Sequence, residues 1–174
     1  MSEMVPWFER VFKFDLPEGL FPNVLERLRG TPARLEERLS PALRRVLIQK
    51  EGSSWSIQEN AGHLLDLEPL WAARVGDFVQ GNKRLQTADL TNRKTHEAGH
   101  NNSPLEKILS SFRAARSSLV ARLESLDPDI FGRTALHPRL DQPMRLLDHI
   151  FFVAEHDDHH LARISVLVRK FGDA

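Results

Sequence analysis

The chain has 174 residues, 41% of them hydrophobic, and its 24 basic residues balance 24 acidic ones. This length predicts a single domain, residues 1–174, that buries about 70% of the surface its unfolded form exposes. The absence of cysteine excludes disulfides, cysteine-ligated zinc or iron–sulfur sites and cysteine nucleophiles, and the zero net charge removes the electrostatic case for a general nucleic-acid or anionic-membrane binder.

The first twenty residues read as an irregular segment. Pro6, Pro17 and Gly19 interrupt it, and we expect its aromatic side chains, among them Trp7 and Phe8, to seal the core. The segment lacks the basic and apolar regions of a secretory signal peptide, and no apolar run in the chain approaches the roughly 18 residues that span a bilayer. We therefore expect a cytoplasmic protein that partners neither nucleic acid nor a membrane.

Two of the four bundle helices are predicted in the first half of the chain, with a further short helix after Ser40 and Pro41. A threonine and a proline, typical of an N-cap and a first helical position, begin a helix over 31–39. Ser56 and Glu59 form a capping box, in which each side chain satisfies a backbone N–H of the other residue, so a second helix is predicted over 56–80. Pro69 is expected to kink or interrupt this helix because proline lacks the N–H donor and clashes with the preceding turn.

Two more helices are predicted in the second half. After a long polar connection over 81–102, a capping box at Ser103–Glu106 begins a helix that runs to about Leu126. The last helix is predicted to begin at 141–143 and to continue to about Phe171. No segment alternates apolar and polar residues as a strand does, so the predicted fold class is all-α, a four-helix bundle.

Four of the eight histidines, including His159, which is expected to point to solvent, fall within the last predicted helix. His156 and His160 are four residues apart, so their rings can converge on one metal ion. His149 lies two turns earlier, about 10 Å along the axis, which is too far to share that ion comfortably. A third ligand must come from another helix, and the leading candidate is His63, at the edge of the apolar face of the second helix.

This histidine pattern predicts a metal site with an open position. Three neutral imidazoles with a free fourth position are typical of catalytic rather than structural zinc, and imidazole also suits nickel and iron, so the identity of the metal stays open. Asp157, near the middle of the apolar face, is expected to orient an imidazole. The alternative is that His63 is a hydrogen-bonded core residue and the other histidines form a solvated, pH-sensitive face, and spacing alone leaves both open.

Four segments carry a resemblance to the DinB-like superfamily, in particular to its metal-dependent hydrolase branch. They are WSIQENAGHL at 55–64, FRAAR at 112–116, HPRL at 137–140 and AEHDDHHLA at 154–162. The resemblance implies an up-down-down-up four-helix bundle, often dimeric, with one divalent metal ion held by three histidines. By motif these are His63, His156 and His160. Characterised relatives include thiol-dependent transferases and isomerases that act with low-molecular-weight thiols such as mycothiol or bacillithiol.

The sequence His-Glu-Ala-Gly-His at 96–100 matches the zincin motif, in which a stable helix presents two histidines and a glutamate base. Gly99 lies inside the motif here and no apolar periodicity surrounds it, so we interpret the match as a loop. His96 and His100 remain candidates for contact with a substrate. No role follows from the sequence for His137 or His149.

Arg116 lies at the centre of the apolar stripe of the third predicted helix. A buried guanidinium needs an anionic partner. Glu68 also points inward, so one interpretation is a structural ion pair between the two residues. The other is that Arg116 faces the pocket and holds a substrate carboxylate by a two-pronged contact.

The first functional hypothesis is a metal-dependent enzyme that activates water or a low-molecular-weight thiol, for hydrolysis or thiol transfer on a small-molecule substrate. Since the chain has no cysteine, any thiol is a diffusible cosubstrate. Glu59 and Asp66, about one turn to either side of His63, and Arg116 are the candidate catalytic residues. The second hypothesis is a non-catalytic, stress-related binding protein with a structural metal. A di-metal bundle of the ferritin type is excluded because neither Glu59 nor Glu155 has a histidine three residues later.

Overall fold

A computed structural model describes residues 4–172, most of which are helical. The helices are α1 (Phe21–Leu39), α2 (Arg44–Leu47), α3 (Ile57–Gln80), α4 (Arg93–Glu97), α5 (Leu105–Glu124) and α6 (Leu146–Gly172), and the strands are β1 (Thr134–His137) and β2 (Gln142–Arg145). Short 3-10 turns lie at Trp7–Glu9, Glu18–Leu20, His100–Asn102 and Pro128–Ile130. No helix in this part of the chain combines the length and the apolar character needed to cross a membrane.

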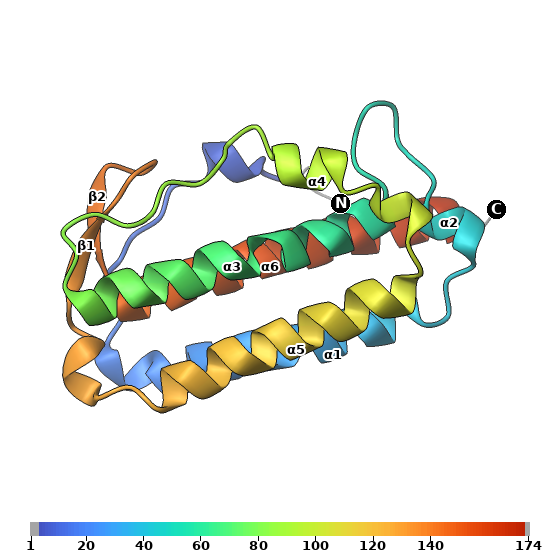
Figure 1. Ribbon diagram of the computed structural model, residues 1–174. Coiled ribbons are helices and arrows are strands. Elements are labelled where there is room, and N and C mark those ends of the chain that lie inside the picture. Colours follow the sequence, from blue (N-terminus) through green and yellow to red (C-terminus); the bar gives the residue numbers. More distant parts are fainter. Residues whose placement is uncertain (1–3, 173–174) are drawn as a thin grey trace.

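The four long helices form the bundle, and their directions are up, down, down and up. In Figure 1, α3 and α5 both run from right to left, whereas α1 and α6 run from left to right. Helices α1 and α3 each pack against both α5 and α6. This confirms the topology that the family resemblance implied. Because α3 and α5 are parallel, residues 81–104 must return along the whole bundle, and Figure 1 shows this crossover above α3 and α6.

Helix α3 begins and ends where its sequence predicts. Ser56 Oγ accepts a hydrogen bond from the backbone N–H of Glu59 at 3.1 Å, and the Ser56 N–H donates to the Glu59 carboxylate at 2.8 Å, so the capping box is confirmed. The helix ends at Gly81, whose φ of 71° favours glycine. The predicted interruption at Pro69 is wrong, because packing against α5 and α6 holds the helix continuous through a single missing donor.

Two other helix starts differ from prediction. Helix α1 begins at Phe21 rather than at 31, and Thr31 is buried inside the helix, with its hydroxyl oxygen 3.0 Å from the Arg27 carbonyl oxygen. Pro22, in the first turn, is the start signal that the later threonine–proline pair obscures. Helix α5 has Pro104 as its N-cap with no side-chain cap, so the predicted second capping box does not form.

A β-hairpin precedes the last helix, so the all-α assignment is only approximate. Strands β1 and β2 pair antiparallel, from Thr134 opposite Arg145 to His137 opposite Gln142. Strands of four residues are too short to give a readable alternation. The last helix therefore begins at Leu146 and not at 141–143, at the point where the Asp148 carboxylate accepts the backbone N–H of Arg145 at 2.9 Å.

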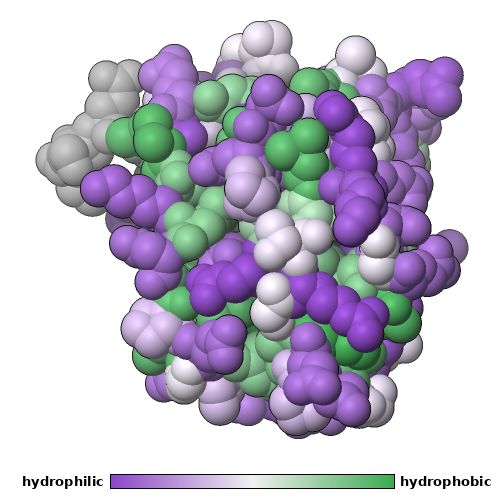
Figure 2. Space-filling model, turned by 90° about the vertical axis from the view of Figure 1, so that its left-hand side faces the viewer, coloured by the Kyte–Doolittle hydropathy of each residue, from purple (hydrophilic) through white to green (hydrophobic). Residues whose placement is uncertain are grey.

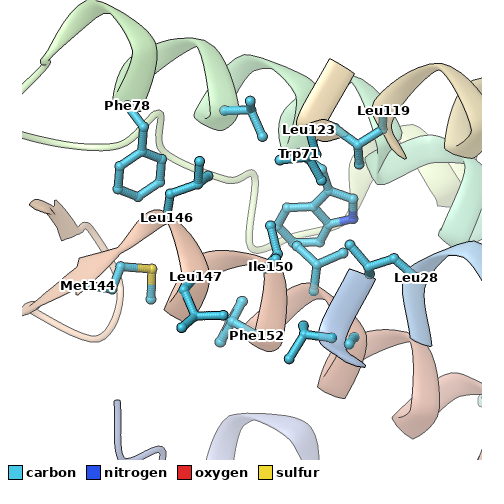
Figure 3. Packing of buried hydrophobic residues seen from close by; sticks show 14 of the residues in the cluster. Leu28, Trp71, Phe78, Leu119, Leu123, Met144, Leu146, Leu147, Ile150 and Phe152 are labelled. Carbon is cyan, nitrogen blue, oxygen red and sulfur yellow. The ribbon is translucent and has the colours of Figure 1, made fainter. Parts of the chain in front are cut away.

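The core consists of two apolar clusters separated by a polar layer. Figure 3 shows the cluster next to the hairpin, in which side chains of the long helices and of β2 converge, among them Leu28, Trp71, Leu119, Met144 and Ile150. The second cluster fills the opposite end of the bundle. Seen from the hairpin end, hydrophilic side chains cover most of the surface and apolar ones lie between them (Figure 2).

The polar layer takes one buried side chain from each long helix: Thr31, Glu68, Arg116 and Asp157. The Arg116 guanidinium donates to Glu68 at 2.6 Å and is also paired with Asp157. The Thr31 hydroxyl donates to Asp157 at 2.9 Å. The structural ion pair predicted between Arg116 and Glu68 is thus confirmed. Asp157 contacts Arg116 and Thr31 rather than an imidazole, because its carboxylate points into the bundle.

Candidate metal centre

The packing of α3 against α6 brings three histidines together. His63 lies on α3, and His156 and His160 lie one turn apart on α6. One ring nitrogen from each of the three falls within 4.8 Å of the others, and no other group of three metal-binding side chains meets this criterion within residues 4–172. Their ring centroids are 4.6 to 5.3 Å apart. The sequence-predicted trio therefore converges in space.

All three imidazoles are held in the neutral form that binds metal. Burial lowers the pKa of His63 to about 4, and nearby histidines add to this, although Asp66 opposes it. Burial first, and then the proximity of the other rings, lowers the pKa of His156 and of His160 well below 6.5. Neutral rings keep a lone pair available for a cation.

Hydrogen bonds fix the tautomer of His63. Its Nδ1 lies 3.0 Å from the Thr95 hydroxyl, which itself donates to the Asp66 carboxylate at 2.9 Å. Since the hydroxyl has only one hydrogen, Thr95 must accept from His63 Nδ1–H. The lone pair of His63 therefore lies on Nε2, and Asp66 holds the ring in place through Thr95.

Asn60 fixes the tautomer of His160 in the same way. The Asn60 amide nitrogen donates to the carbonyls of Ser56 and Trp55, so its oxygen faces His160 Nδ1 at 2.9 Å. That oxygen can only accept, which places the His160 lone pair on Nε2. The buried Nδ1 of His156 has no hydrogen-bond partner among the described residues. Three neutral imidazoles, two of them oriented by hydrogen bonds, form a donor set that fits a divalent ion such as zinc, nickel or iron.

A cavity of about 1000 Å³ opens next to the three histidines. Residues of α3 and α6, of the N-terminal segment, of the crossover and of the hairpin turn line it. The Trp7 ring lies 5.0 Å from that of His156, and the Trp55 ring lies 4.6 Å from that of His63. Trp7 packs against the core as expected but also lines this cavity, whereas Phe8 is exposed and lines the cavity. The volume suits a small molecule.

The candidate catalytic residues lie around the site rather than in the cavity wall. Glu59 caps α3 and pairs with Lys50 at 2.8 Å. Asp66 lies behind His63, where its carboxylate also contacts His100 at 2.8 Å. Arg116 belongs to the polar layer, so nothing here supports a contact between it and a substrate carboxylate.

The zincin-like segment lies outside the helices of the bundle. Helix α4 ends at Glu97, and Gly99 has a φ of 62°, so His96 and His100 do not share a helix. His100 packs on α3 at Gly62, where an added Cβ would lie 2.3 Å from the imidazole. No single helix presents both histidines, as predicted, but His96 and Glu97 end a short helix rather than lying in a loop. Neither histidine is among the residues lining the cavity.

The remaining histidines occupy three different environments. His159 is half-buried and lines the cavity beside Trp7, because the N-terminal segment covers what was expected to be a solvent-facing position. His149 is buried between Trp71 and Phe78, each with its ring centroid 5.8 Å away. His137 faces Arg74 within the cavity wall.

Two residues that orient the histidines escaped prediction. Asn60 is a polar residue on the apolar side of α3, one turn before His63, and that placement was a usable signal. Thr95 carried none, because it lies in a polar crossover whose path only the tertiary structure defines.

The sequence matches a known protein superfamily, and the fold is similar to solved structures. The DinB superfamily matches residues 23–164. YfiT from Bacillus subtilis, described as a probable metal-dependent hydrolase with an unusual four-helix bundle topology, is similar with a TM-score of 0.82 and 17% identity over 94% of both chains. A mycothiol-dependent maleylpyruvate isomerase gives a TM-score of 0.66 and 12% identity, over 85% of this chain and 60% of that one. No curated protein sequence matches significantly.

Proposed function

The chain belongs to the DinB superfamily, and from this premise we propose that it is an enzyme dependent on one divalent metal ion, held by His63, His156 and His160. The observation that carries the proposal is the convergence of three neutral imidazoles beside a cavity of about 1000 Å³. A purely structural site would be enclosed by a fourth protein ligand. In the described part of the chain, no fourth histidine or carboxylate joins the group.

The residues around the site have distinct tasks. When bound, a divalent ion in such a site acts as a Lewis acid and lowers the pKa of a water or thiol at its open position. Thr95 and Asn60 hold His63 and His160 with their Nε2 lone pairs free, and Asp66 is a positioning residue that acts through Thr95. The rings of Trp7 and Trp55 cover the histidines and limit access of bulk water.

We propose hydrolysis or thiol transfer on a small molecule as the reaction class. The two similar structures support this range, since one is described as a probable metal-dependent hydrolase and the other as a mycothiol-dependent isomerase. The chain has no cysteine, so a thiol would enter as a low-molecular-weight cosubstrate. We also propose that the protein acts in the cytoplasm and that it is a homodimer. Light scattering of the purified protein tests the dimer directly.

Metal analysis of untagged protein tests the site. We expect about one equivalent of metal per chain in the wild type and its loss in His63→Ala. His96→Ala is the matched control, because His96 also contacts the Trp55 ring, at 5.6 Å, yet lies outside the group. Undiminished metal in His63→Ala contradicts the proposal, and loss of metal in His96→Ala would revive the zincin interpretation.

The competing hypothesis of a structural metal makes a different thermal prediction. Two apolar clusters and the polar layer already hold α3 against α6, so removal of the ion by a chelator should lower the melting temperature only modestly. A large loss of stability on chelation favours the structural role.

A further inference from the structure

A second group of functional side chains lies in the same cavity, and its centre is Arg74. This residue is 1% exposed, yet its guanidinium forms no ion pair within residues 4–172. Its Nε donates to the Gln86 carbonyl at 2.9 Å, and its Nη1 lies 3.1 Å from His137 Nε2. Burial lowers the Arg74 pKa to about 10. The Asp77 carboxylate opposes this shift through its charge but forms no ion pair with Arg74. A buried cation without a carboxylate in contact is costly, and a ligand that supplies the charge would offset that cost.

Arg139 adds a second guanidinium, which has no acidic partner in the part of the chain that the structure describes. It lies on the hairpin turn, and its Nη2 is buried with no hydrogen-bond partner among the described residues. It stacks over the ring of Phe8 at 5.3 Å and over that of Phe152 at 5.8 Å. Asp89 also lines the cavity, but its carboxylate accepts its hydrogen bonds from Thr91 and the backbone of Arg93.

His137 lies close to both arginines, and two hydrogen-bond donors point at its ring, which can accept only one hydrogen bond. The backbone N–H of Leu140 points at its Nδ1 at 3.2 Å, and Arg74 Nη1 points at its Nε2. A neutral imidazole accepts at one nitrogen only, so one of these contacts sets a donor against a donor. Burial and the two guanidinium charges lower the His137 pKa to about 3, so the ring is neutral. An oxygen that only accepts hydrogen bonds would resolve the conflict.

We propose that Arg74, Arg139 and His137 form a binding subsite for a carboxylate carried by the substrate or by its thiol cosubstrate. A carboxylate has no donor of its own and can accept from two guanidinium groups at once. Its charge would compensate two cations that form no ion pair with any carboxylate of residues 4–172. Arg163, a third arginine of the cavity, is already neutralised by Glu51 at 2.6 Å and is not part of the subsite.

The position of the subsite defines the shape of the ligand. Arg74 lies eleven residues after His63 on α3, roughly 16 Å along the helix axis. The rings of Trp71 and Phe152 lie between the two groups, with Trp71 5.6 Å from the His156 ring and Phe152 5.0 Å from the His137 ring. The ligand is thus an extended small acid with an apolar middle. Only the assignment of its other end to the three histidines rests on the proposed function.

Binding to the metal-free full-length protein tests the subsite without relying on activity. The probes are 4-phenylbutyrate and its uncharged amide, 4-phenylbutyramide, titrated while tryptophan fluorescence is recorded. We expect the acid to bind at least about tenfold more tightly than the amide, and more weakly as salt is added. A second pair, 3-mercaptopropionate and 3-mercaptopropionamide, shows whether the carboxylate belongs to the thiol instead.

Three variants assign the effect to residues. Arg139→Gln should remove the preference for the acid, with a loss of about tenfold or more in its affinity and little change for the amide. Arg74→Gln should do the same, and the half-buried Arg139 provides the decisive test if the Arg74 variant does not fold. Arg163→Gln is the matched control: it removes the same charge from the same cavity and should leave the preference intact.

The outcomes separate this proposal from that of the metal site. A preference for either acid that Arg139→Gln abolishes supports the subsite and identifies which molecule carries the carboxylate. Equal binding of acid and amide in both pairs, or a preference that survives in Arg139→Gln, overturns it. Since no metal is present, these results hold whether or not His63, His156 and His160 bind an ion.

Discussion

The backbone carbonyl of Leu28 accepts a hydrogen bond from Nη1 of Arg116 at 3.3 Å. This carbonyl lacks its helical donor because Pro32, four residues later in α1, has no N–H. The proline therefore leaves an acceptor free on α1 at the level where the buried guanidinium of α5 needs one. Glu68 and Asp157 supply the other acceptors, so a polar side chain that would otherwise destabilise the core is satisfied by three helices.

Removal of Arg116 should be strongly destabilising. Arg116→Met leaves the Glu68 and Asp157 carboxylates buried together without a cation, and we expect a loss of about 3–5 kcal/mol in the free energy of unfolding. Urea titration followed by circular dichroism measures it. Arg113→Met, one turn earlier on α5, removes an exposed pair with Glu36 and should cost less than about 1 kcal/mol. Similar losses in both variants would contradict a special role for the polar layer.

His149 should make the stability depend on pH in a defined window. Burial, and then the charge of Arg74, lowers its pKa well below 6.5 in the folded protein. The unfolded chain takes up a proton on this ring as the pH falls through about 6.5, whereas the folded chain does not. Its contribution is therefore complete above that pH and is lost as the pH falls towards the folded-state pKa. We expect His149→Leu to remove about 2 kcal/mol of the decrease in unfolding free energy between pH 7 and pH 5, measured by urea titration. An unchanged pH dependence would show that His149 does not titrate on unfolding.

Gly62 should tolerate no side chain. A Cβ at this position would lie 2.3 Å from the His100 ring, which packs on α3 and contacts the Asp66 carboxylate of the same helix at 2.8 Å. We expect Gly62→Ala to lower the free energy of unfolding by about 1–3 kcal/mol. Gly30→Ala, inside α1 with nothing within 4 Å of the added carbon, should instead raise it by up to about 1 kcal/mol. If thermal unfolding ranks the two variants the other way, His100 does not pack as described.

Thr95 should affect metal affinity without touching the metal. Thr95→Val keeps the shape of the side chain but removes the hydroxyl between His63 and Asp66, so we expect metal affinity to fall about 10–100-fold. Competition with a chromophoric chelator measures it. Thr91→Val, in the same crossover with its hydroxyl bonded only to Asp89, should leave affinity unchanged. Equal affinities in Thr95→Val and the wild type would show that His63 needs no orienting partner.

The parts of the site that depend on helical geometry could be predicted from the sequence. His156 and His160 could be paired because four residues make about one turn, and His63 could be placed because it lies at the edge of the apolar face of its helix. The same reasoning paired Arg116 with Glu68, since both fall on buried faces. These inferences need only the position of a residue on its own helix.

The contacts that could not be predicted from the sequence join segments that lie far apart in the chain. Thr95 meets His63 and Asp66 only because the crossover returns along α3, and Trp7 meets His156 only because the N-terminal segment lies over the bundle. Asp157 was assigned to an imidazole because the positions of its actual partners, Arg116 and Thr31, follow from the packing of three helices. No periodic pattern in the sequence predicts such tertiary contacts.

The parallel arrangement of α3 and α5 has a consequence for how such proteins diversify. It forces the chain to cross back over the bundle through residues 81–104, and this crossover supplies Thr87–Leu90 to the cavity wall, while the histidines belong to the helices beneath. Loops accept substitutions and changes of length that packed helices do not. Selectivity for the incoming molecule can therefore evolve in the crossover while the reactive centre below it is inherited unchanged.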